Sequence, residues 1–174
     1  RERRLACALV QSWGADTLAP FVLRADKSYF FSRDEDAFLA YRVVSGVAIV
    51  SGDPIGPPES AEQVVRSFIA FARARDWRLA ILGASEHWLP LYAQLGLHSL
   101  YHGDEAVVDP RLFSLEGRPI RKVRQSVSRL GGAGYHAAVL RPSEIDESLR
   151  AQLEEVAGAW RGDAPERGFV MALD

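Results

Sequence analysis

Three short runs between Ser28 and Ser51 constrain the fold of this chain more than any other feature. The runs are SYFFS at 28–32, AFLAYRVV at 37–44 and VAIVS at 47–51. They are rich in aromatic and β-branched residues, which favour strands. Polar residues 32–36 separate the first two runs, and Ser45-Gly46 separates the last two. Such short connections join antiparallel neighbours, so the sequence predicts a three-stranded meander.

The residues after the meander predict helices that alternate with strands. A rigid loop from Gly52 to Pro58 leads to a helix that begins at Glu59 or Ser60. The expected buried stripe of this helix is Val64, Val65, Phe68, Ile69 and Ala72. A nearly continuous apolar run at 77–83 predicts a central strand.

The remaining expected elements follow the same reasoning. Before the meander we expect a helix from Leu5 to Trp13. After it we expect a helix with Trp88, Leu91, Tyr92 and Leu95, capped by Ser85 and ended by Gly96, then strands at 97–102 and 105–109. Farther on we expect a strand at 135–140 and a helix from Glu144 to about Trp160, capped by Ser143. This order predicts an α/β (α+β) fold, one mixed sheet with helices on both faces.

A stretch from Arg118 to Leu130 carries five cations and no acid. Pro119 suits a first helical turn, where its missing N–H has no partner to lose. The apolar stripe is Ile120, Val123, Val127 and Leu130, and the cations are Arg118, Arg121, Lys122, Arg124 and Arg129. A helix that needs only solubility usually mixes charges, so we expect an anionic ligand. Two alternatives stay open: a solvated face, or ion pairs with Asp104, Glu105 or Glu116.

Composition limits the class of protein. The 174 residues are 48% hydrophobic and 25% charged, with a net charge of −2 and a pI near 6.1. These values are typical of a soluble globular chain and argue against a surface that binds nucleic acid over its whole area.

One cysteine excludes an internal disulfide, and no Cys/His spacing is typical of zinc, so no metal is expected. No apolar run reaches the roughly 20 residues that cross a bilayer. Because the chain does not begin with Met and stops in an apolar run, we expect a fragment.

Several separated motifs resemble those of one known family. The stretches are DKSYFFS, AFLAYRVVSGVAIVSGDPIGPPE, YHGDEAVVD and FSLEGRPIRKVRQSVSRL. They resemble the soluble C-terminal domain of bacterial phosphatidylglycerol lysyltransferases, also called lysylphosphatidylglycerol synthetases or multiple peptide resistance factors. The resemblance covers residues from about Trp13 to Leu173.

The resemblance implies two tandem acetyltransferase-like (GNAT-like) folds. Residues 1–110 would form the first fold, 111–134 a linker with the basic connecting helix, and 135–174 the truncated start of a second fold. Much of the aminoacyl pocket is expected in that second fold, so this fragment is expected to be catalytically incomplete. Its exposed apolar face is expected to drive homodimers or domain exchange.

The reaction implied is transfer of a lysyl or other aminoacyl group from aminoacyl-tRNA to phosphatidylglycerol. This changes membrane lipid charge and resistance to cationic peptides. The implied partners are aminoacyl-tRNA, anionic phospholipid, and a transmembrane or synthetase domain of a longer protein at the cytoplasmic face of the membrane. The alternatives are a non-catalytic tRNA- or membrane-binding module attached to a lysyl-tRNA synthetase, and a small-molecule N-acyltransferase.

The loop from Gly52 to Pro58 limits which cofactor is expected, and it contains the candidate catalytic carboxylate. Acetyltransferases normally bind a pyrophosphate there, but three prolines remove backbone donors, so no cofactor, and in particular no acetyl-CoA, is expected. Asp53 is the candidate catalytic carboxylate, as a base or a ligand for a lysyl ammonium, although it can also simply close the turn. We interpret His87 and His102 as surface or satisfied histidines, and Trp88 as a core residue.

Overall fold

The structure, a computed structural model, describes residues 1–104 and 107–164. The described residues divide into two compact units, the first from 1 to 100 and the second from 101 to 164. Each unit is described by itself. Whether 1–110 and 135–174 belong to two acetyltransferase-like folds stays a prediction.

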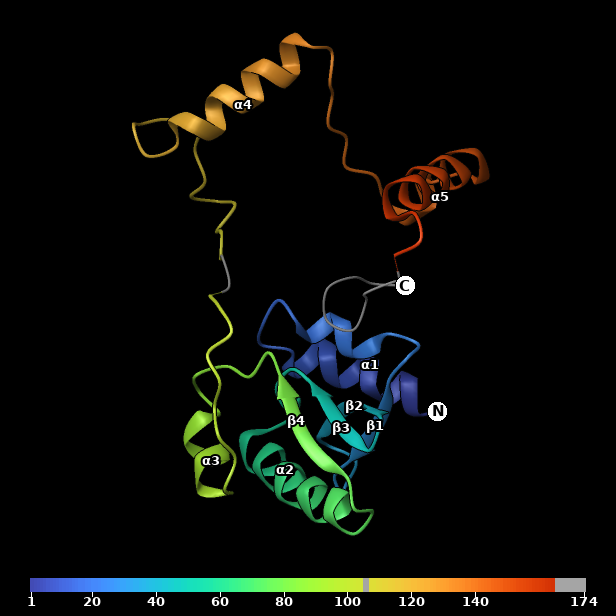
Figure 1. Cartoon of the computed structure of the whole chain (residues 1–174), viewed down its shortest axis with the longest axis vertical. Helices are drawn as coiled ribbons and strands as arrows, with labels where there is room; N and C mark the ends of the chain where they lie inside the picture. Colours follow the sequence, from blue (N-terminus) through green and yellow to red (C-terminus); the bar gives the residue numbers. More distant parts are fainter. Residues whose placement is uncertain (105–106, 165–174) are drawn as a thin grey trace. The chain divides into compact units, whose positions relative to one another are not determined.

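The first unit is built on a four-stranded mixed sheet with the order β1-β2-β3-β4 (Figure 1). The strands are β1 (Ser28–Phe31), β2 (Phe38–Val44), β3 (Val47–Ser51) and β4 (Arg78–Leu82). The first three are antiparallel neighbours, with Tyr29 opposite Ala40 and Val43 opposite Ala48. The predicted meander is therefore confirmed.

The fourth strand differs from the prediction. β4 pairs with β3 in parallel, with Ile49 opposite Ala80. It lies at the edge of the sheet that the described residues form, and its residues alternate between exposed and half-buried. The apolar run at 77–83 predicted a central strand, and this was wrong because an apolar run does not reveal how many neighbours a strand has.

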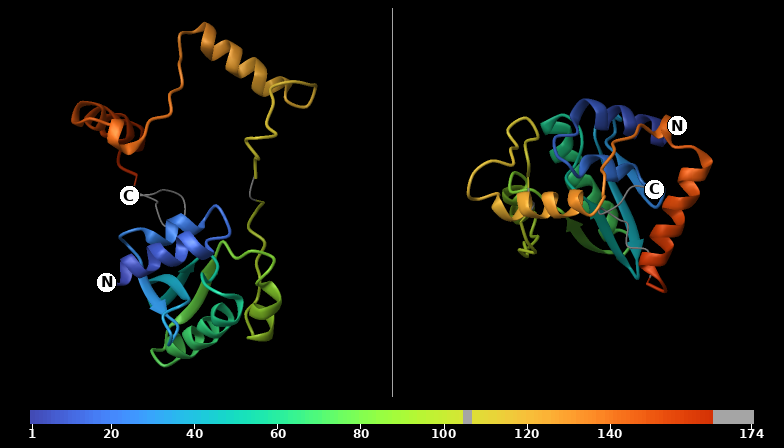
Figure 2. Two further views of the ribbon diagram at one scale, coloured as in Figure 1. Left: turned by 180° about the vertical axis from the view of Figure 1, so that it is seen from behind. Right: turned by 90° about the horizontal axis from the view of Figure 1, so that it is seen from above.

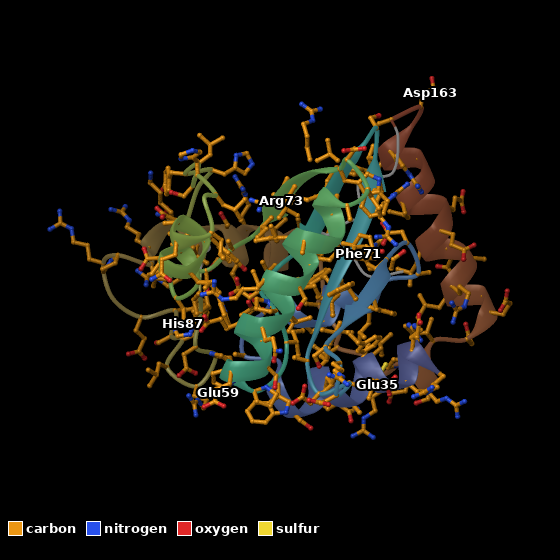
Figure 3. The ribbon with its side chains drawn as sticks, turned by 90° about the horizontal axis from the view of Figure 1, so that it is seen from below. Glu35, Glu59, Phe71, Arg73, His87 and Asp163 are labelled. Atoms are coloured by element: carbon orange, nitrogen blue, oxygen red, sulfur yellow. The ribbon has the colours of Figure 1, made fainter. Side chains whose placement is uncertain are left out.

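Helices cover both faces of the sheet, as predicted (Figures 1 and 2). On one face lie α1 (Glu2–Trp13) and η1 (Ala19–Leu23), whose Ala6, Leu9 and Val22 form a cluster with Phe38 of β2. On the other face lie α2 (Pro58–Arg73) and α3 (Leu89–Gln94), which pack on Leu39. Figure 3 shows α2 across this face, from Glu59 at its beginning to Arg73 at its end. Its predicted stripe is buried throughout.

Helix starts were predicted less well than helix interiors. α2 begins at Pro58, and the hydroxyl of Ser60 donates to Asp36 Oδ2 at 2.6 Å instead of capping the helix. Ser85 does not cap α3, which begins at Leu89. The predicted cap Ser143 lies in the short 3-10 helix η2 (Pro142–Glu144). The helix that follows, α5 (Glu147–Arg161), is capped instead by the side chain of Asp146. Gly96 does end α3, with a left-handed φ of 80°.

The second unit contains α4 (Arg121–Gly132), η2 and α5. Residues 97–102 and 135–140 are not strands, and neither are 107–109; Glu105 and Ala106 lie outside the described residues. The helices α4 and α5 have no buried residue. Their apolar side chains, including Val127 and Trp160, are exposed. The described core is thus that of the first unit, and the oligomeric state stays a prediction. No helix in the described ranges has the length and apolarity that crossing a membrane requires.

The packing predicts which aromatic residue matters most for stability. Phe68 is 1% exposed, and its ring centroid lies 5.3 Å from that of Phe30 and 4.9 Å from that of Tyr41. Phe68→Ala should lower the free energy of unfolding in urea by about 3–5 kcal/mol, because it leaves a cavity. Phe113→Ala, at a residue that is 50% exposed, is the control and should change it by about 0.5 kcal/mol or less. Equal losses in the two variants would contradict this packing.

Candidate functional site

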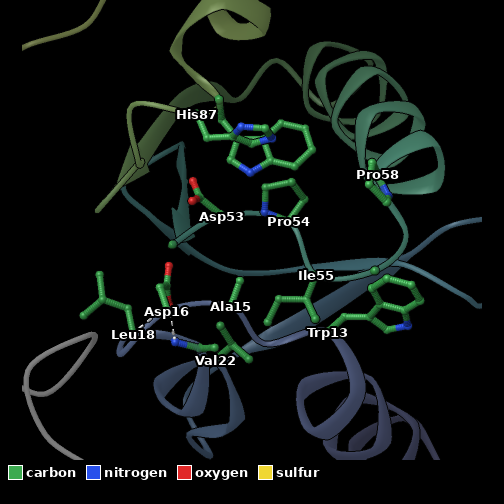
Figure 4. A pocket seen from close by; sticks show the side chains of 14 residues that line it. Trp13, Ala15, Asp16, Leu18, Val22, Asp53, Pro54, Ile55, Pro58 and His87 are labelled. Atoms are coloured by element: carbon green, nitrogen blue, oxygen red, sulfur yellow. Dashed lines mark hydrogen bonds between the residues drawn. The ribbon is translucent and has the colours of Figure 1, made fainter. Parts of the chain in front are cut away.

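A pocket of about 230 Å³ lies in the first unit, at the edge of the sheet where β3 and β4 end (Figure 4). Loops that follow neighbouring parallel strands leave the sheet at one edge, which commonly forms a binding crevice. Three segments line it: residues 13–22 from the end of α1 to η1, the loop 52–58 after β3, and residues 87–88 before α3. Segments distant in sequence therefore meet at one place.

Backbone contacts hold the loop 52–58 in position. The N–H of Gly52 donates to the carbonyl of Leu82 at 2.8 Å, which ties the end of β3 to β4. Ile55 and Phe38 exchange two backbone hydrogen bonds, at 2.8 and 3.0 Å, which tie the loop to β2. Gly56 passes so close to Ala37 that a Cβ added at Gly56 would collide with the Cβ of Ala37. The loop is thus fixed on both sides of Asp53.

Asp53 is the partly buried carboxylate of this pocket. The backbone N–H of Ser85 donates to Asp53 Oδ1 at 3.1 Å. Burial raises the pKa of Asp53 above its ordinary value, while hydrogen bonds from the side chain and backbone of Ser85 oppose that rise. The negative charge of Asp16 raises the pKa further, and His87 lowers it. Such a carboxylate can accept a proton or hold a cation.

Asp16 faces the pocket from the opposite wall. Figure 4 shows Asp53 and His87 on one side, and Asp16 with Val22 on the other. Asp16 Oδ1 accepts hydrogen bonds from the N–H groups of Leu18 and Ala19, at 2.9 and 2.7 Å, so the start of η1 fixes its position. Its Oδ2 makes no hydrogen bond in the part of the chain that is described.

Two buried hydroxyl groups lie near this site. Tyr92 OH and Ser51 Oγ are buried and have no hydrogen-bond partner among the described residues. Burial raises the pKa of Tyr92, and the charge of Asp53 raises it further. The apolar cluster beside the pocket therefore contains a hydroxyl, that of Tyr92, without a partner among the described residues.

The loop 52–58 has few backbone N–H groups that could bind a phosphate. Pro54, Pro57 and Pro58 have no N–H, and the N–H groups of Gly52 and Ile55 are already bonded. Residues 1–104 and 107–164 contain no group of three or more His, Cys, Asp or Glu that could hold a metal ion. The expectation that acetyl-CoA does not bind here stays a prediction.

The five cations between Arg118 and Arg129, in α4 and in the turn before it, divide into two kinds. Arg124 Nη1 donates to the carbonyls of Leu115 and Gly117, at 2.6 and 3.1 Å, so this guanidinium braces the turn before the helix. The phosphate contact expected for Arg124 from the sequence stays a prediction. The other four predicted residues are exposed and form no ion pair or side-chain hydrogen bond among the described residues: Arg118, Arg121, Lys122 and Arg129. The pairing alternative is not observed with Asp104 or Glu116, and Glu105 lies outside the described residues.

Sequence reasoning found one member of the pocket and missed the others. Asp53 was found because it follows a strand in a loop rich in Gly and Pro. His87 is exposed and Trp88 packs on the core, as interpreted from the sequence, and the structure shows that both also line the pocket. Asp16 and Trp13 carried no local signal, because only the packing of α1 and η1 brings them to this edge.

The close approach of Gly56 to Ala37 allows the position of the loop to be tested. Its φ of +150° is one that side chains rarely adopt, whereas Gly46, with a φ of +75°, has open space where a Cβ would lie. Gly56→Ala should therefore lower the free energy of unfolding by at least about 1 kcal/mol more than Gly46→Ala, because it adds a collision to backbone strain. Thermal and urea unfolding measure this difference. Equal effects would show that the loop does not lie against Ala37.

Comparison with known proteins places this chain in a family. The family model described as "Phosphatidylglycerol lysyltransferase, C-terminal" matches residues 7–174. A lysylphosphatidylglycerol biosynthesis bifunctional protein LysX from Rhodococcus jostii is 38% identical over 172 residues, which is 99% of this chain and 15% of that protein.

Two solved structures are also similar. L-PGS from Bacillus licheniformis matches with a TM-score of 0.83 and 25% identity, over 98% of this chain and 52% of that one. A C-terminal domain described as that of a putative lysylphosphatidylglycerol synthetase, from Agrobacterium fabrum, matches with a TM-score of 0.82 and 28% identity, over 95% and 52%. This chain thus spans about half of the solved relatives, and it belongs to the phosphatidylglycerol lysyltransferase C-terminal family.

Proposed function

We propose that this chain is part of an enzyme that transfers a lysyl group from lysyl-tRNA to a glycerol hydroxyl of phosphatidylglycerol. Family membership and the names of the relatives support the reaction. Because the chain spans 15% of the LysX relative and 52% of the solved relatives, the activity is proposed for the longer protein. The product exchanges an anionic lipid headgroup for a cationic one, which fits a role in resistance to cationic peptides.

The chemistry requires positioning more than strong covalent catalysis. The ester that joins lysine to tRNA is already activated, so the protein must orient the lipid hydroxyl and stabilise an oxyanion. A modest general base is sufficient to accept the proton of the lipid hydroxyl as the new ester bond forms, and to return a proton to the ribose oxygen of the tRNA as the old ester bond breaks. Asp53 is the candidate for a carboxylate that acts near the reacting groups, and its catalytic role stays a prediction.

The exposed cations of α4 and of the turn before it are the observation that carries the proposal. Both substrates are polyanions or anions, through the tRNA backbone and the lipid phosphate. Arg118, Lys122 and Arg129 present positive charge without a protein partner in the described chain. No acid lies between residues 118 and 130 to neutralise them. Phosphate contact would relieve their mutual repulsion and supply salt-dependent affinity.

The location follows from the lipid substrate. We place the reaction at the cytoplasmic face of the membrane, where aminoacyl-tRNA and phosphatidylglycerol can meet. A membrane-spanning or synthetase segment elsewhere in the longer protein would keep this chain near one of its substrates.

A transfer assay tests the proposal. A protein that contains this chain and extends to the length of the solved relatives is incubated with radiolabelled lysyl-tRNA and phosphatidylglycerol vesicles. Label should appear in the lipid. The triple variant Arg118→Ala, Lys122→Ala, Arg129→Ala should reduce the rate. Removing each cation that binds a phosphate should also lower the salt dependence of tRNA binding by about 0.7–0.9 in log–log slope.

Arg150→Ala is the matched control, because it removes one exposed cation from α5 and leaves α4 intact. No label in lipid from the unmodified protein would contradict the transferase. Unchanged transfer and salt dependence in the triple variant would show that the polyanion binds elsewhere. Tight tRNA binding with no lipid product would instead favour a binding module.

A further inference from the structure

Charge is distributed unevenly between the two ends of the sheet in the first unit. At the pocket end, β3 and β4 finish, the turn 32–36 joins β1 to β2, and α2 begins. The acids at this end include Asp16, Asp34, Glu35, Asp36, Asp53 and Glu59. At the opposite end, here called the hairpin end, β2 turns into β3, β1 and β4 begin, and α2 finishes. The cations at the hairpin end, where the acids are Asp26 and Asp76, are Arg24, Lys27, Arg42, Arg73, Arg75 and Arg78. Figure 3 shows Glu35 and Glu59 at one end of this unit and Arg73 at the other.

Two arginines at the hairpin end are free to bind an anion. Arg73, in the last turn of α2, and Arg78, the first residue of β4, are exposed and form no ion pair or side-chain hydrogen bond among the described residues. Arg75, which lies between them in sequence, instead braces the end of α2. Its Nη1 donates to the carbonyl of Phe71 at 3.3 Å, and its guanidinium carbon lies 3.5 Å from the centre of the Phe71 ring. The hairpin end therefore attracts anions, while the acids of the pocket end repel them.

The tip of the β2–β3 hairpin adds exposed apolar surface beside these arginines. Val43 and Val44 are 37% and 45% exposed. Ser45 and Gly46 have φ values of 50° and 75°, and two successive positive φ values are typical of a tight two-residue hairpin turn. The N–H of Arg78 donates to the carbonyl of Gly46 at 2.9 Å. The apolar tip is therefore held next to a cation.

The positions of the two valines indicate what kind of partner fits this end. They are successive residues of β2, so their side chains point to opposite faces of the sheet. A rigid protein that packs on one face leaves the other valine in water, whereas a fluid lipid surface can surround both. A nucleic-acid backbone offers phosphates to the arginines but no apolar surface to the valines. Apolar side chains flanked by cations are typical of segments that bind anionic bilayers.

We propose that the hairpin end docks on the surface of an anionic phospholipid bilayer, with Val43 and Val44 among the headgroups and Arg73 and Arg78 on lipid phosphates. This inference rests on the proposed function and deepens it, because it names the surface of the first unit that meets the membrane. The pocket beside Asp53 then lies at the end of this unit that faces away from the bilayer.

A dye attached at a single position tests this orientation. In a Cys7→Ser background, an environment-sensitive dye is placed at Val44→Cys or, as the control, at Gln63→Cys, an exposed position nearer the beginning of α2. Each labelled 174-residue chain is mixed with vesicles of equal parts phosphatidylglycerol and phosphatidylcholine. The emission of the dye at residue 44 should move to shorter wavelength, and that at residue 63 should not.

The comparison of two positions is needed because the cations of α4 can also attract vesicles. Vesicles of phosphatidylcholine alone should shift neither dye, since the attraction requires anionic lipid. No shift at residue 44 with the mixed vesicles, or equal shifts at residues 44 and 63, would overturn the inference.

Two double variants separate the charge from the apolar contact. Arg73→Ala with Arg78→Ala should weaken cosedimentation with the mixed vesicles about tenfold or more, because each cation near an anionic surface contributes roughly fivefold to affinity. Val43→Thr with Val44→Thr keeps the branched shape and the charge but removes apolar surface, and should weaken vesicle binding by at least about twofold. The valine variant should leave the binding of tRNA unchanged.

The matched control is Arg33→Ala with Arg150→Ala, which removes two exposed cations that lie away from the hairpin end. It should weaken vesicle binding much less than the Arg73 and Arg78 variant does. Circular dichroism verifies that each variant folds. Equal losses in these two arginine variants would overturn the inference. Loss of tRNA binding without loss of vesicle binding in the Arg73 and Arg78 variant would also overturn it and assign this end to RNA.

The transfer assay separates this inference from the proposed function. If the longer protein makes lysyl lipid but the dye at residue 44 does not respond to anionic vesicles, the docking assignment is wrong and the transferase stands. If the dye responds as described but no lysyl lipid forms, the docking assignment is supported and the proposed reaction fails.

Discussion

The first unit depends on one strand whose alternate residues belong to two different cores. In β2, Phe38 and Ala40 pack with α1 and η1, while Leu39 packs with α2. Successive side chains of a strand point to opposite faces, so this single strand holds both layers of helices. Phe38 also pairs with Ile55 through two backbone hydrogen bonds. Packing in the core and the position of the Asp53 loop are therefore set by the same residue.

The buried carboxyl of Asp53 destabilises the folded chain. Burial raises the pKa of Asp53 above its ordinary value of 3.8. Between that value and the raised one, the folded chain binds more protons than the unfolded chain, so the Asp53 contribution lowers stability as pH rises through this window. The hydrogen bonds from Ser85 oppose the effect but do not reverse it. Costs of this kind are commonly retained at functional sites, where activity needs a destabilised group.

Local patterns predicted the interior of the first unit well. The meander followed from β-branched and aromatic runs with short turns, and the buried stripe of α2 followed from its helical spacing. Positions that depend on neighbours were predicted poorly. The 77–83 run became an edge strand, and 97–102 and 135–140 formed no strand, because residue type alone does not supply a partner strand. Ser60 bonds to Asp36 instead of capping α2, a choice set by the distant turn before β2.

The candidate site shows the same difference between residues that a local pattern reveals and residues that only tertiary packing brings together. Asp53 could be predicted because its loop has a sequence signature, and the exposed cations of α4 because no acid accompanies them. Asp16 and His87 could not, since only tertiary packing brings three separate segments to one edge. Arg124 has a second contact that the sequence did not reveal: its guanidinium bonds to two carbonyls of the turn before α4, and its predicted phosphate contact stays a prediction.

The pKa of the Asp53 carboxyl, followed by carbon NMR in the unmodified chain and in an Asp16→Asn variant, tests the central claim most directly. Asp16, His87 and Tyr92 are the titratable groups whose charges couple to it. In the unmodified chain the pKa of Asp53 should lie above 3.8, because the carboxyl is buried in the pocket. Asp16→Asn should lower this pKa, because it removes a negative charge that raises it, whereas Asp34→Asn, at an exposed acid in the turn between β1 and β2, should leave it nearly unchanged. A pKa of Asp53 at or below 3.8 in the unmodified chain would contradict the account of this pocket.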